Sequence, residues 1–460
     1  LKYLDQLHGF IIRHGLESHR TLNFKLQRSY SSLGHVEKSV VLFNHTRNRD
    51  IYLYSSLIHG HAINGLLGDA LRFYVQMLGE YIEANAFTIS GVLKACSTLE
   101  SGAALHCHAY KFGFQTNAYV TASLVDVYAR GGNVVSARMI FDRMEERDVV
   151  SWNVMIDGYA QHGRPSEALI LFRNMLKSRF RPNEATMVAA LSACGQVGSL
   201  ESGKWIHSYL GSTSCSGNAQ LATALIDMYC KCGSIHDARK VFDGIRNKDV
   251  VCYNAMMGGY SLHGQGEEAL NLFNQMLETG LRPTDITFIS VLNACAHSGF
   301  ISEGQALFSS MKDDHGIRPK VEHYGCMVHL LGKNGKLNQA WDMVMNMDTD
   351  PDSVVWVTLL DSCRLHKNVA MAEKVTEYLK HHRIAVADDP GMHVLLSGIY
   401  AAAGMSDDVA ETRAKMKRAG LRKQPGCSCI DVNGVVEEFV AGDVKHPMSR
   451  EIYETLDSIN

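Results

Sequence analysis

The segment from Val149 to Asn183 contains two helical patterns separated by a short break, and it constrains the fold more than any other stretch. In the first pattern, four apolar residues follow the i, i+3, i+4, i+7 spacing of one helix face, namely Trp152, Met155, Ile156 and Tyr159. Gly163 and Pro165 then interrupt the pattern, because glycine frees the backbone and proline is tolerated only in a first helical turn. One helical hairpin cannot bury both of its apolar faces, so it needs neighbours.

Two signatures of such neighbours recur along the chain. A tyrosine precedes a glycine by four positions at Tyr30/Gly34, Tyr128/Gly132, Tyr159/Gly163, Tyr229/Gly233, Tyr260/Gly264 and Tyr400/Gly404. An alanine precedes an aromatic residue by four positions at Ala70/Tyr74, Ala137/Phe141, Ala168/Phe172, Ala238/Phe242 and Ala269/Phe273. A two-helix unit repeated at a period in the thirties is the signature of a solenoid. We therefore predict an all-α fold, an α-solenoid superhelix of helix-turn-helix repeats.

The bulk composition excludes several classes of protein. The net charge is −3 over 460 residues. The chain therefore lacks the excess of positive charge that is expected of a duplex-DNA binder. The 12 cysteines mostly occupy apolar repeat positions, which favours a reducing compartment over a disulfide framework. No apolar run reaches membrane-spanning length, so we expect no membrane partner. Because the chain starts at Leu1 within a helical pattern, we expect that its targeting segment is missing.

Cutting the chain at the repeat boundaries gives units of alternating length. After a partial unit at 1–19, the units span 20–50, 51–85, 86–117, 118–148, 149–183, 184–218, 219–249, 250–284, 285–320 and 321–352. These units resemble pentatricopeptide repeats of the plant organellar variety, which alternates long, short and standard types. The standard type is VVSWNVMIDGYAQHG, the long type is EATMVAALSACGQVG, and the short type is LATALIDMYCKCGSIHDARKVFDGI.

The pattern changes after residue 352. SVVWVTLLDSCRLHKNV and HVLLSGIYAAAGMSDDVAETRAKMKRAG, which form helical hairpins in our interpretation, resemble the E segments of organellar RNA-editing factors. Alternating apolar residues around Asn433-Gly434 predict a short β-hairpin on a type I′ turn. This part resembles the start of an E+ segment, although Cys429 stands where the family usually has Trp. We therefore expect a repeat array at 1–352, E-type helical repeats at 353–425 and an E+ start at 426–460.

Motifs for chemistry are weak in this chain. A deaminase zinc site needs His-x-Glu together with Cys-x-x-Cys, and no Cys-x-x-Cys occurs, while His35-Val36-Glu37 is far from any cysteine pair. The string from Gly198 to Lys204 fits a phosphate-binding loop, but Trp205 replaces the Ser or Thr that would hold magnesium. We therefore predict no catalytic residues, no metal site and no cofactor.

The resemblance implies a protein that reads one RNA base per repeat. In such repeats the fifth and last residues of a unit contact the base, and the second residue packs against its face. The implied pairs are Ser55 with Asn85 for adenine, Asn153 with Asn183 for a pyrimidine, Thr223 with Asp249 for guanine, and Asn254 with Thr284 for a pyrimidine. Thr284 departs from the usual Asp or Asn, and Phe24 and Ala122 fit no base.

The implied base-packing residues are Tyr52, Val150 and Val251. Because the family's arrays run parallel to RNA, the resemblance implies a target of the form 5′-A-n-n-Y-n-G-Y upstream of an edited cytidine. The alternative interpretation is that a polar fifth residue simply lies on a solvated helix face.

The resemblance implies an adaptor for organellar C-to-U RNA editing rather than an enzyme. Its partners would be single-stranded organellar RNA and, through the E region, a deaminase-bearing protein and accessory editing factors in trans. The alternatives are an RNA stability or splicing factor, and a protein–protein scaffold without an RNA role. The resemblance favours the chloroplast, with the mitochondrion as the alternative, and it implies no DNA partner. The target transcript and the oligomeric state cannot be read from the sequence.

Overall fold

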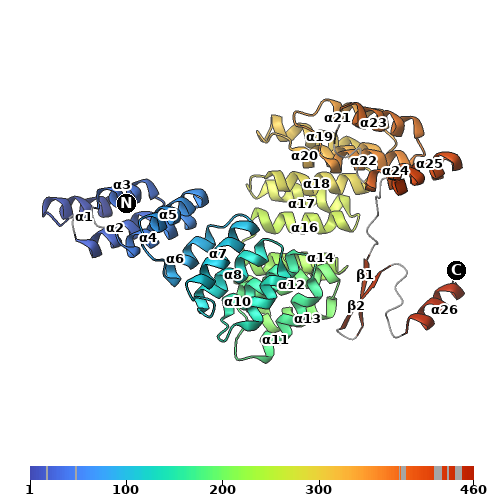
Figure 1. Ribbon diagram of the computed structural model, residues 1–460. Coiled ribbons are helices and arrows are strands. Elements are labelled where there is room, and N and C mark those ends of the chain that lie inside the picture. Colours follow the sequence, from blue (N-terminus) through green and yellow to red (C-terminus); the bar gives the residue numbers. More distant parts are fainter. Residues whose placement is uncertain are drawn as a thin grey trace. The chain divides into compact units, whose positions relative to one another are not determined.

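The protein is seen in a computed structural model that describes residues 1–16, 19–46, 49–382, 384, 390–418, 427–432, 435–440 and 448–459. The predicted all-α repeat architecture is confirmed, because short antiparallel helices follow one another along nearly all of the described chain (Figure 1). The chain forms two compact units, Leu1–Ala193 and Cys194–Asn460. The predicted domain boundaries at 352/353 and 425/426 stay predictions.

The helices of the first unit alternate between the first and second helix of successive repeats. They are α1 (Lys2–Arg13), α2 (Arg20–Ser32), α3 (Val36–His45), α4 (Ile51–Ile63), α5 (Leu67–Gly79), α6 (Ala86–Lys94), α7 (Leu99–Lys111), α8 (Ala118–Arg130), α9 (Val134–Arg143), α10 (Val149–Gln161) and α11 (Pro165–Lys177). The boundary between the units falls within α12 (Glu184–Val197).

The second unit continues the same alternation as far as α25. Its helices are α13 (Leu200–Gly217), α14 (Ala219–Lys231), α15 (Ile235–Gly244), α16 (Val250–Leu262), α17 (Gly266–Glu278), α18 (Asp285–Ser298), α19 (Ile301–Asp313), α20 (Val321–Lys333), α21 (Leu337–Met345), α22 (Ser353–Leu365), α23 (Val369–His381), α24 (Pro390–Ala402) and α25 (Ser406–Arg418).

The recurring glycines and alanines have the structural roles that the sequence predicts. Gly163 and Gly264 take positive φ angles of 70° and 67°, so they end the first helix of their repeats where a side chain would strain the backbone. Ala168 and Ala269 are completely buried, which lets the two helices of a hairpin approach closely. The signatures therefore mark the turn and the tight contact of each hairpin.

The first helices of successive repeats pack directly against one another. In the first unit α2 contacts α4, α4 contacts α6, α6 contacts α8 and α8 contacts α10, and in the second unit the row runs from α14 through α16, α18, α20 and α22 to α24. The contact is close, because a Cβ atom added to Gly259 of α16 would lie 2.2 Å from Cys230 Sγ of α14. Equivalent residues of the first helices therefore line up in rows.

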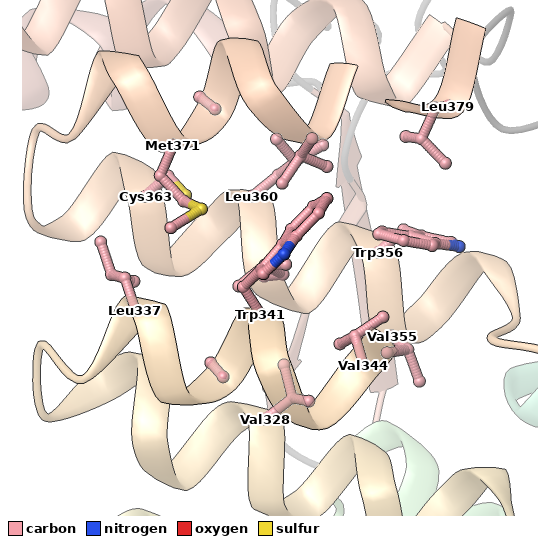
Figure 2. Packing of buried hydrophobic residues seen from close by; sticks show 14 of the residues in the cluster. Val328, Leu337, Trp341, Val344, Val355, Trp356, Leu360, Cys363, Met371 and Leu379 are labelled. Atoms are coloured by element: carbon pink, nitrogen blue, oxygen red, sulfur yellow. The ribbon is translucent and has the colours of Figure 1, made fainter. Parts of the chain in front are cut away.

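The two helical hairpins after residue 352 share a hydrophobic core with the last repeat. Trp341 of α21 and Trp356 of α22 lie in one buried cluster, with ring centroids 6.4 Å apart (Figure 2). Leu360 and Leu379 extend this cluster through α22 and α23. The E-like hairpins are thus a structural continuation of the repeat stack.

The described residues after α25 form two strands and one helix. Strands β1 (Cys427–Val432) and β2 (Val435–Val440) pair antiparallel, with Cys427 opposite Val440 and Val432 opposite Val435. The predicted Asn433-Gly434 turn lies outside the described residues, so its type stays a prediction. Helix α26 (Ser449–Ile459) follows. Within the described part of the chain, no helix is both long and apolar enough to cross a membrane.

Candidate RNA interface

The last residue of a repeat is the N-cap of the next repeat's first helix. The Asp50, Asn85 and Asp249 side chains accept hydrogen bonds from the backbone N–H groups of Leu53, Thr88 and Cys252, at 3.0, 2.8 and 2.9 Å. The same role is filled by Asn117, Asp148, Asn183, Asn218, Thr284 and Asp352. Capping satisfies an N–H group that has no partner within the helix. The predicted last-residue positions therefore have a structural role in every one of these repeats.

Capping explains why these residues are Asn or Asp, but it does not explain the choice between them. Both caps use one carboxylate or amide oxygen, and both stabilise the helix equally well. The second terminal atom differs, because Asn has an NH₂ group that donates and ionised Asp has an oxygen that only accepts. The choice between Asn and Asp can therefore carry information about a ligand.

The Asn153 and Asn183 pair is brought together directly. The Asn153 Nδ2 donates to Asn183 Oδ1 at 2.9 Å. The Thr186 hydroxyl, at the third position of the next unit, lies within hydrogen-bonding distance of both Asn153 Oδ1 and Asn183 Oδ1. The oxygens are thus occupied within the protein, and the Asn183 amide N–H groups are the donors that this pair can offer to a ligand.

The Ser55 and Asn85 pair is linked only through a third residue. Thr88 Oγ1 lies 2.6 Å from Ser55 Oγ and donates to Asn85 Oδ1 at 2.9 Å. Ser55 is buried, with 2% of its surface exposed, so Asn85 is the more accessible member of this pair. The Thr88 hydroxyl fixes the geometry of both.

The Thr223 and Asp249 pair is also bridged, here by Cys252. Thr223 Oγ1 lies 3.5 Å from Cys252 Sγ, and the Cys252 N–H donates to Asp249. Burial opposes ionisation of Asp249, but hydrogen bonds from Cys252 and the backbone outweigh it and lower the pKa of this carboxyl. At neutral pH the exposed Asp249 therefore presents an ionised oxygen, which can only accept hydrogen bonds.

Asn254 and Thr284 form the loosest of the four pairs. Asn254 Nδ2 is 3.5 Å from Thr284 Oγ1. Asn254 Oδ1 is buried and has no hydrogen-bond partner among the described residues. Leaving a buried polar atom unpaired costs about 1–3 kcal/mol, so this pair is held less well than the other three.

The predicted base-packing residues lie exposed on the first helices, next to these pairs. The exposed fractions of Tyr52, Val150 and Val251 are 63%, 59% and 59%. The same second position also exposes large apolar side chains that the sequence interpretation did not name, namely Phe87, Tyr119, Ile286 and Val354. Single exposed apolar residues need no explanation, but the rows of them in register within each unit are candidate stacking surfaces.

The bridging third residues were missed by the sequence interpretation. Thr88, Thr186 and Cys252 each link the fifth and last residues of the preceding unit. A signal was present, because a polar residue three positions after an Asn, Asp or Thr cap is typical of a capping box. Asp148 with Ser151, and Thr284 with Thr287, form complete capping boxes.

The weaker motifs have plain structural roles. His35 is the N-cap residue of α3. The phosphate-loop-like string spans the start of α13 and follows helix α12 rather than a strand. His106 and His108 bind the Tyr128 and Tyr74 hydroxyls, at 3.1 Å each. Among the described residues, no three His, Cys, Asp or Glu side chains are grouped as a metal site would need.

The fold and these repeated polar pairs define a helical-repeat protein that presents one similar site per repeat. Matches to the PPR repeat family cover residues 147–196 and 248–297, and matches to the PPR repeat cover 52–82, 122–149, 222–250, 286–315 and 322–350. The E motif matches residues 366–431, and the E+ motif matches 436–460. Together with the relatives below, these matches show that the chain belongs to the pentatricopeptide repeat family.

The chain is similar to several curated proteins of Arabidopsis thaliana. It is 46% identical to the pentatricopeptide repeat-containing protein ELI1, chloroplastic, over 99% of this chain and 77% of that protein. It is 38% identical to CRR2, chloroplastic, over 98% of this chain and 70% of that protein. A third relative, mitochondrial by its name, is 37% identical over 100% of this chain and 71% of its own length. Another, 38% identical, is matched over only 57% of its length.

Solved structures share the fold. The crystal structure of the pentatricopeptide repeat protein PPR10 in complex with an 18-nt psaJ RNA element aligns with a TM-score of 0.67, at 17% identity, over 88% of this chain and 62% of that chain. PPR10 from maize, in another crystal structure, aligns with a TM-score of 0.60, also at 17% identity, over 90% and 61%.

Proposed function

We propose that this protein binds single-stranded RNA in a sequence-specific manner and selects sites for C-to-U editing in an organelle. The observation that carries the proposal is the Asn153, Asn183 and Thr186 network, in which oxygens are occupied and amide donors remain. Similar pairs recur in register beside a row of exposed second residues. A row of base-sized polar sites with stacking surfaces suits unpaired nucleotides, whose edges and faces are both accessible.

The chemistry of the caps assigns a hydrogen-bond sense to each position. Asp249 only accepts, so it suits a base whose ring nitrogen carries a hydrogen, and guanine fits. Asn85 and Asn183 have amide donors, so they suit bases whose ring nitrogen accepts, such as adenine and cytosine. These donor and acceptor roles agree with the target 5′-A-n-n-Y-n-G-Y. They favour cytosine over uracil as its first pyrimidine. Each such contact should contribute about 1–3 kcal/mol of discrimination.

The C-terminal segments support the editing part of the proposal. The E and E+ motif matches follow the repeats in the sequence, and the E-like hairpins share a core with the last repeat. A recruiting surface that shares a core with the last repeat would hold a deaminase-bearing protein and accessory factors close to the 3′ end of the bound RNA. Relatives that are chloroplastic by name favour the chloroplast over the mitochondrion as the compartment.

The proposal is tested with purified protein and two RNAs that differ in one base. The first RNA carries A-n-n-C-n-G-Y, and the second has the G replaced by cytosine, whose ring nitrogen accepts hydrogen bonds. We expect the second RNA to bind about tenfold or more weakly, because it leaves the ionised Asp249 oxygen unpaired. Equal binding to both RNAs would contradict base reading at Thr223 and Asp249, and no binding to either would favour a protein–protein scaffold.

The editing step needs a separate test, because base reading alone also fits an RNA stability or splicing factor. Plants that lack the protein should lose editing at one or a few organellar sites that are preceded by a matching sequence. Unchanged editing at every site, together with altered abundance or splicing of a transcript, would favour the second candidate function. In either case the reading residues are the same.

A further inference from the structure

Three nitrogen-bearing side chains form a row across the first repeats of the first unit. Arg28, His59 and Lys94 are each the ninth residue of a first helix, in α2, α4 and α6. These helices pack side by side in that order. Because the ninth residue lies seven positions after the second, both point from the same face of their helix. The row therefore runs beside the exposed Tyr52 and Phe87.

The charges of this row are not neutralised within the protein. Arg28 and Lys94 are exposed, and within the described part of the chain neither forms an ion pair with a carboxylate. The ninth residue changes sign at the next two repeats, where α8 has Asp126 and α10 has Asp157. Asp126 pairs with Arg130 at 2.8 Å. Among the first helices of the repeats, Arg or Lys therefore occupies the ninth position only in α2 and α6.

His59 lies between the two cations, and the positive charges of both affect its ring. Its pKa is lowered by burial first, and then by the positive charges of Lys94 and Arg28. Its Nδ1 is buried and has no hydrogen-bond partner among the described residues. Its ring also lies 5.5 Å from that of Phe87, the exposed second residue of α6. Cations, an unsatisfied ring nitrogen and exposed aromatic rings therefore occur together.

We propose that the face formed by α2, α4, α6 and α8 grips a segment of single-stranded RNA without regard to its base sequence. Arg28, His59 and Lys94 would bind phosphates, while Tyr52, Phe87 and Tyr119 would stack against successive bases. This inference rests on the proposed RNA binding, and it adds a site that no base-reading pair accounts for. It divides the array into a gripping part at its start, where Ser55 with Asn85 is the one proposed reading pair, and a reading part from α10 onwards.

The residues on this face favour a nucleic acid that is unpaired. Aromatic side chains beside a basic track are the usual composition of sequence-tolerant single-strand sites, because every base has a π-face. A duplex hides those faces, so Tyr52, Phe87 and Tyr119 would have nothing to stack on. Two of the four fifth residues on this face, Phe24 and Ala122, cannot form hydrogen bonds with a base through their side chains, and a third, Ser90, is hydrogen-bonded to Ser123 at 2.8 Å. The repeats that carry the proposed phosphate contacts therefore have few side chains that could read a base.

The charge part of the proposal is tested by a double variant and a matched control. Arg28→Gln with Lys94→Gln removes two cations from the row. Arg143→Gln with Lys177→Gln removes two exposed cations from the second helices α9 and α11. We expect the first variant to bind the A-n-n-C-n-G-Y RNA about tenfold more weakly at low salt, and the slope of log affinity against log salt to shrink by about 1.4. The control should match the wild type.

Two features separate this inference from the proposed function. The loss should be the same for the RNA with G and the RNA with its G replaced, because phosphate contacts do not read bases. Removing the RNA segment that lies over residues 20–117, the 5′ end for a parallel array, should weaken the wild type more than the variant, which has lost its phosphate contacts there. If the wild type distinguishes the two RNAs while both double variants retain its affinity and salt slope, the grip is refuted and base reading stands.

The stacking part has its own variant. Phe87→Ala should weaken binding to both RNAs about tenfold, since stacking on an aromatic ring contributes about 1–3 kcal/mol per base. Phe87 is more than half exposed, so circular dichroism and the melting temperature should change little. Unchanged RNA affinity in both Phe87→Ala and the Arg28/Lys94 variant would overturn the proposal. Binding of polyglutamate to the wild type would then indicate that this face binds an acidic protein rather than RNA.

Discussion

Helices α16 and α22 have the same framework but differ at the position that would read a base. Each is capped by an aspartate, Asp249 for α16 and Asp352 for α22, whose side chains accept from Cys252 N–H at 2.9 Å and Val355 N–H at 3.0 Å. Each exposes a valine at its second position, with exposed fractions of 59% for Val251 and 63% for Val354. The caps and the exposed valines therefore belong to the common scaffold.

The difference lies in the fifth residue of the preceding unit. Asp249 follows a unit whose fifth residue is Thr223, and Cys252 connects the two. Asp352 follows a unit whose fifth residue is Gly325, which has no side chain to pair with it. A Cβ atom at Gly325 would only meet Val355, at 3.9 Å. An acidic cap thus becomes a candidate reader only where the fifth residue completes a polar pair, and the site at α22 is scaffold alone.

The largest expected effect is a loss of stability when a buried side chain of the helical scaffold is removed from α22. Trp356 is 1% exposed and lies in the cluster that joins the last repeat to the E-like hairpins (Figure 2). Trp356→Ala should lower the free energy of unfolding by about 3–5 kcal/mol, because it leaves a large cavity. Chemical denaturation measures this. Val354→Ala, two positions away on the exposed face, should change stability by less than about 0.5 kcal/mol. Similar losses in both variants would mean that Trp356 is not part of a shared core.

The second prediction exchanges the two aspartate caps for asparagine. Asp249→Asn keeps the helix cap but replaces the accepting oxygen by a donor, so the preferred base should change from guanine to adenine. The change in relative affinity should be about tenfold to a hundredfold, measured by fluorescence anisotropy on RNAs that differ at that base. Asp352→Asn keeps its cap as well and should leave every base preference unchanged. Equal effects of the two variants would contradict the distinction between reader and scaffold.

The framework was predictable from the sequence because its causes are local. A glycine at positive φ, a buried alanine and an Asn or Asp cap each act within a few residues, so Gly163, Ala168 and Asp148 mark one hairpin in the sequence as they do in the structure. The same holds for the β1 and β2 segments, whose alternating residues are found in two paired strands. Periodicity of this kind needs no knowledge of distant contacts.

The candidate site was only partly predictable because it is formed between repeats. Asn153 and Asn183 were named as a pair, and their direct bond follows from adjacent helices stacking in register. The bridging role of Thr186 or Cys252, and the burial of Ser55 beneath Thr88, depend on how closely two helices approach. That approach is set by contacts about thirty residues apart in the sequence, such as Gly259 against Cys230. Sequence spacing alone does not give it.

The smallest expected effect is a loss of stability at acidic pH. It concerns the repeats in which a histidine is hydrogen-bonded to a tyrosine. His207 Nδ1 lies 2.8 Å from the Tyr229 hydroxyl, and His8 and His106 bind Tyr30 and Tyr128 in the same way, at 3.0 and 3.1 Å. Burial lowers the pKa of His207 below its ordinary value of 6.5, with Asp237 opposing.

The lowered pKa means that the folded state prefers the neutral ring. As the pH falls through 6.5 the unfolded chain binds more protons than the folded one, so stability falls, whereas well above 6.5 this group adds no pH dependence. Denaturation midpoints at pH 7.5 and pH 5.5 should show the wild type losing stability. His207→Phe should be about 1 kcal/mol less stable at pH 7.5, through the lost hydrogen bond, but should lose less on acidification. If the variant loses as much as the wild type, the acid sensitivity arises elsewhere, and the His207–Tyr229 contact holds the repeats together without responding to pH.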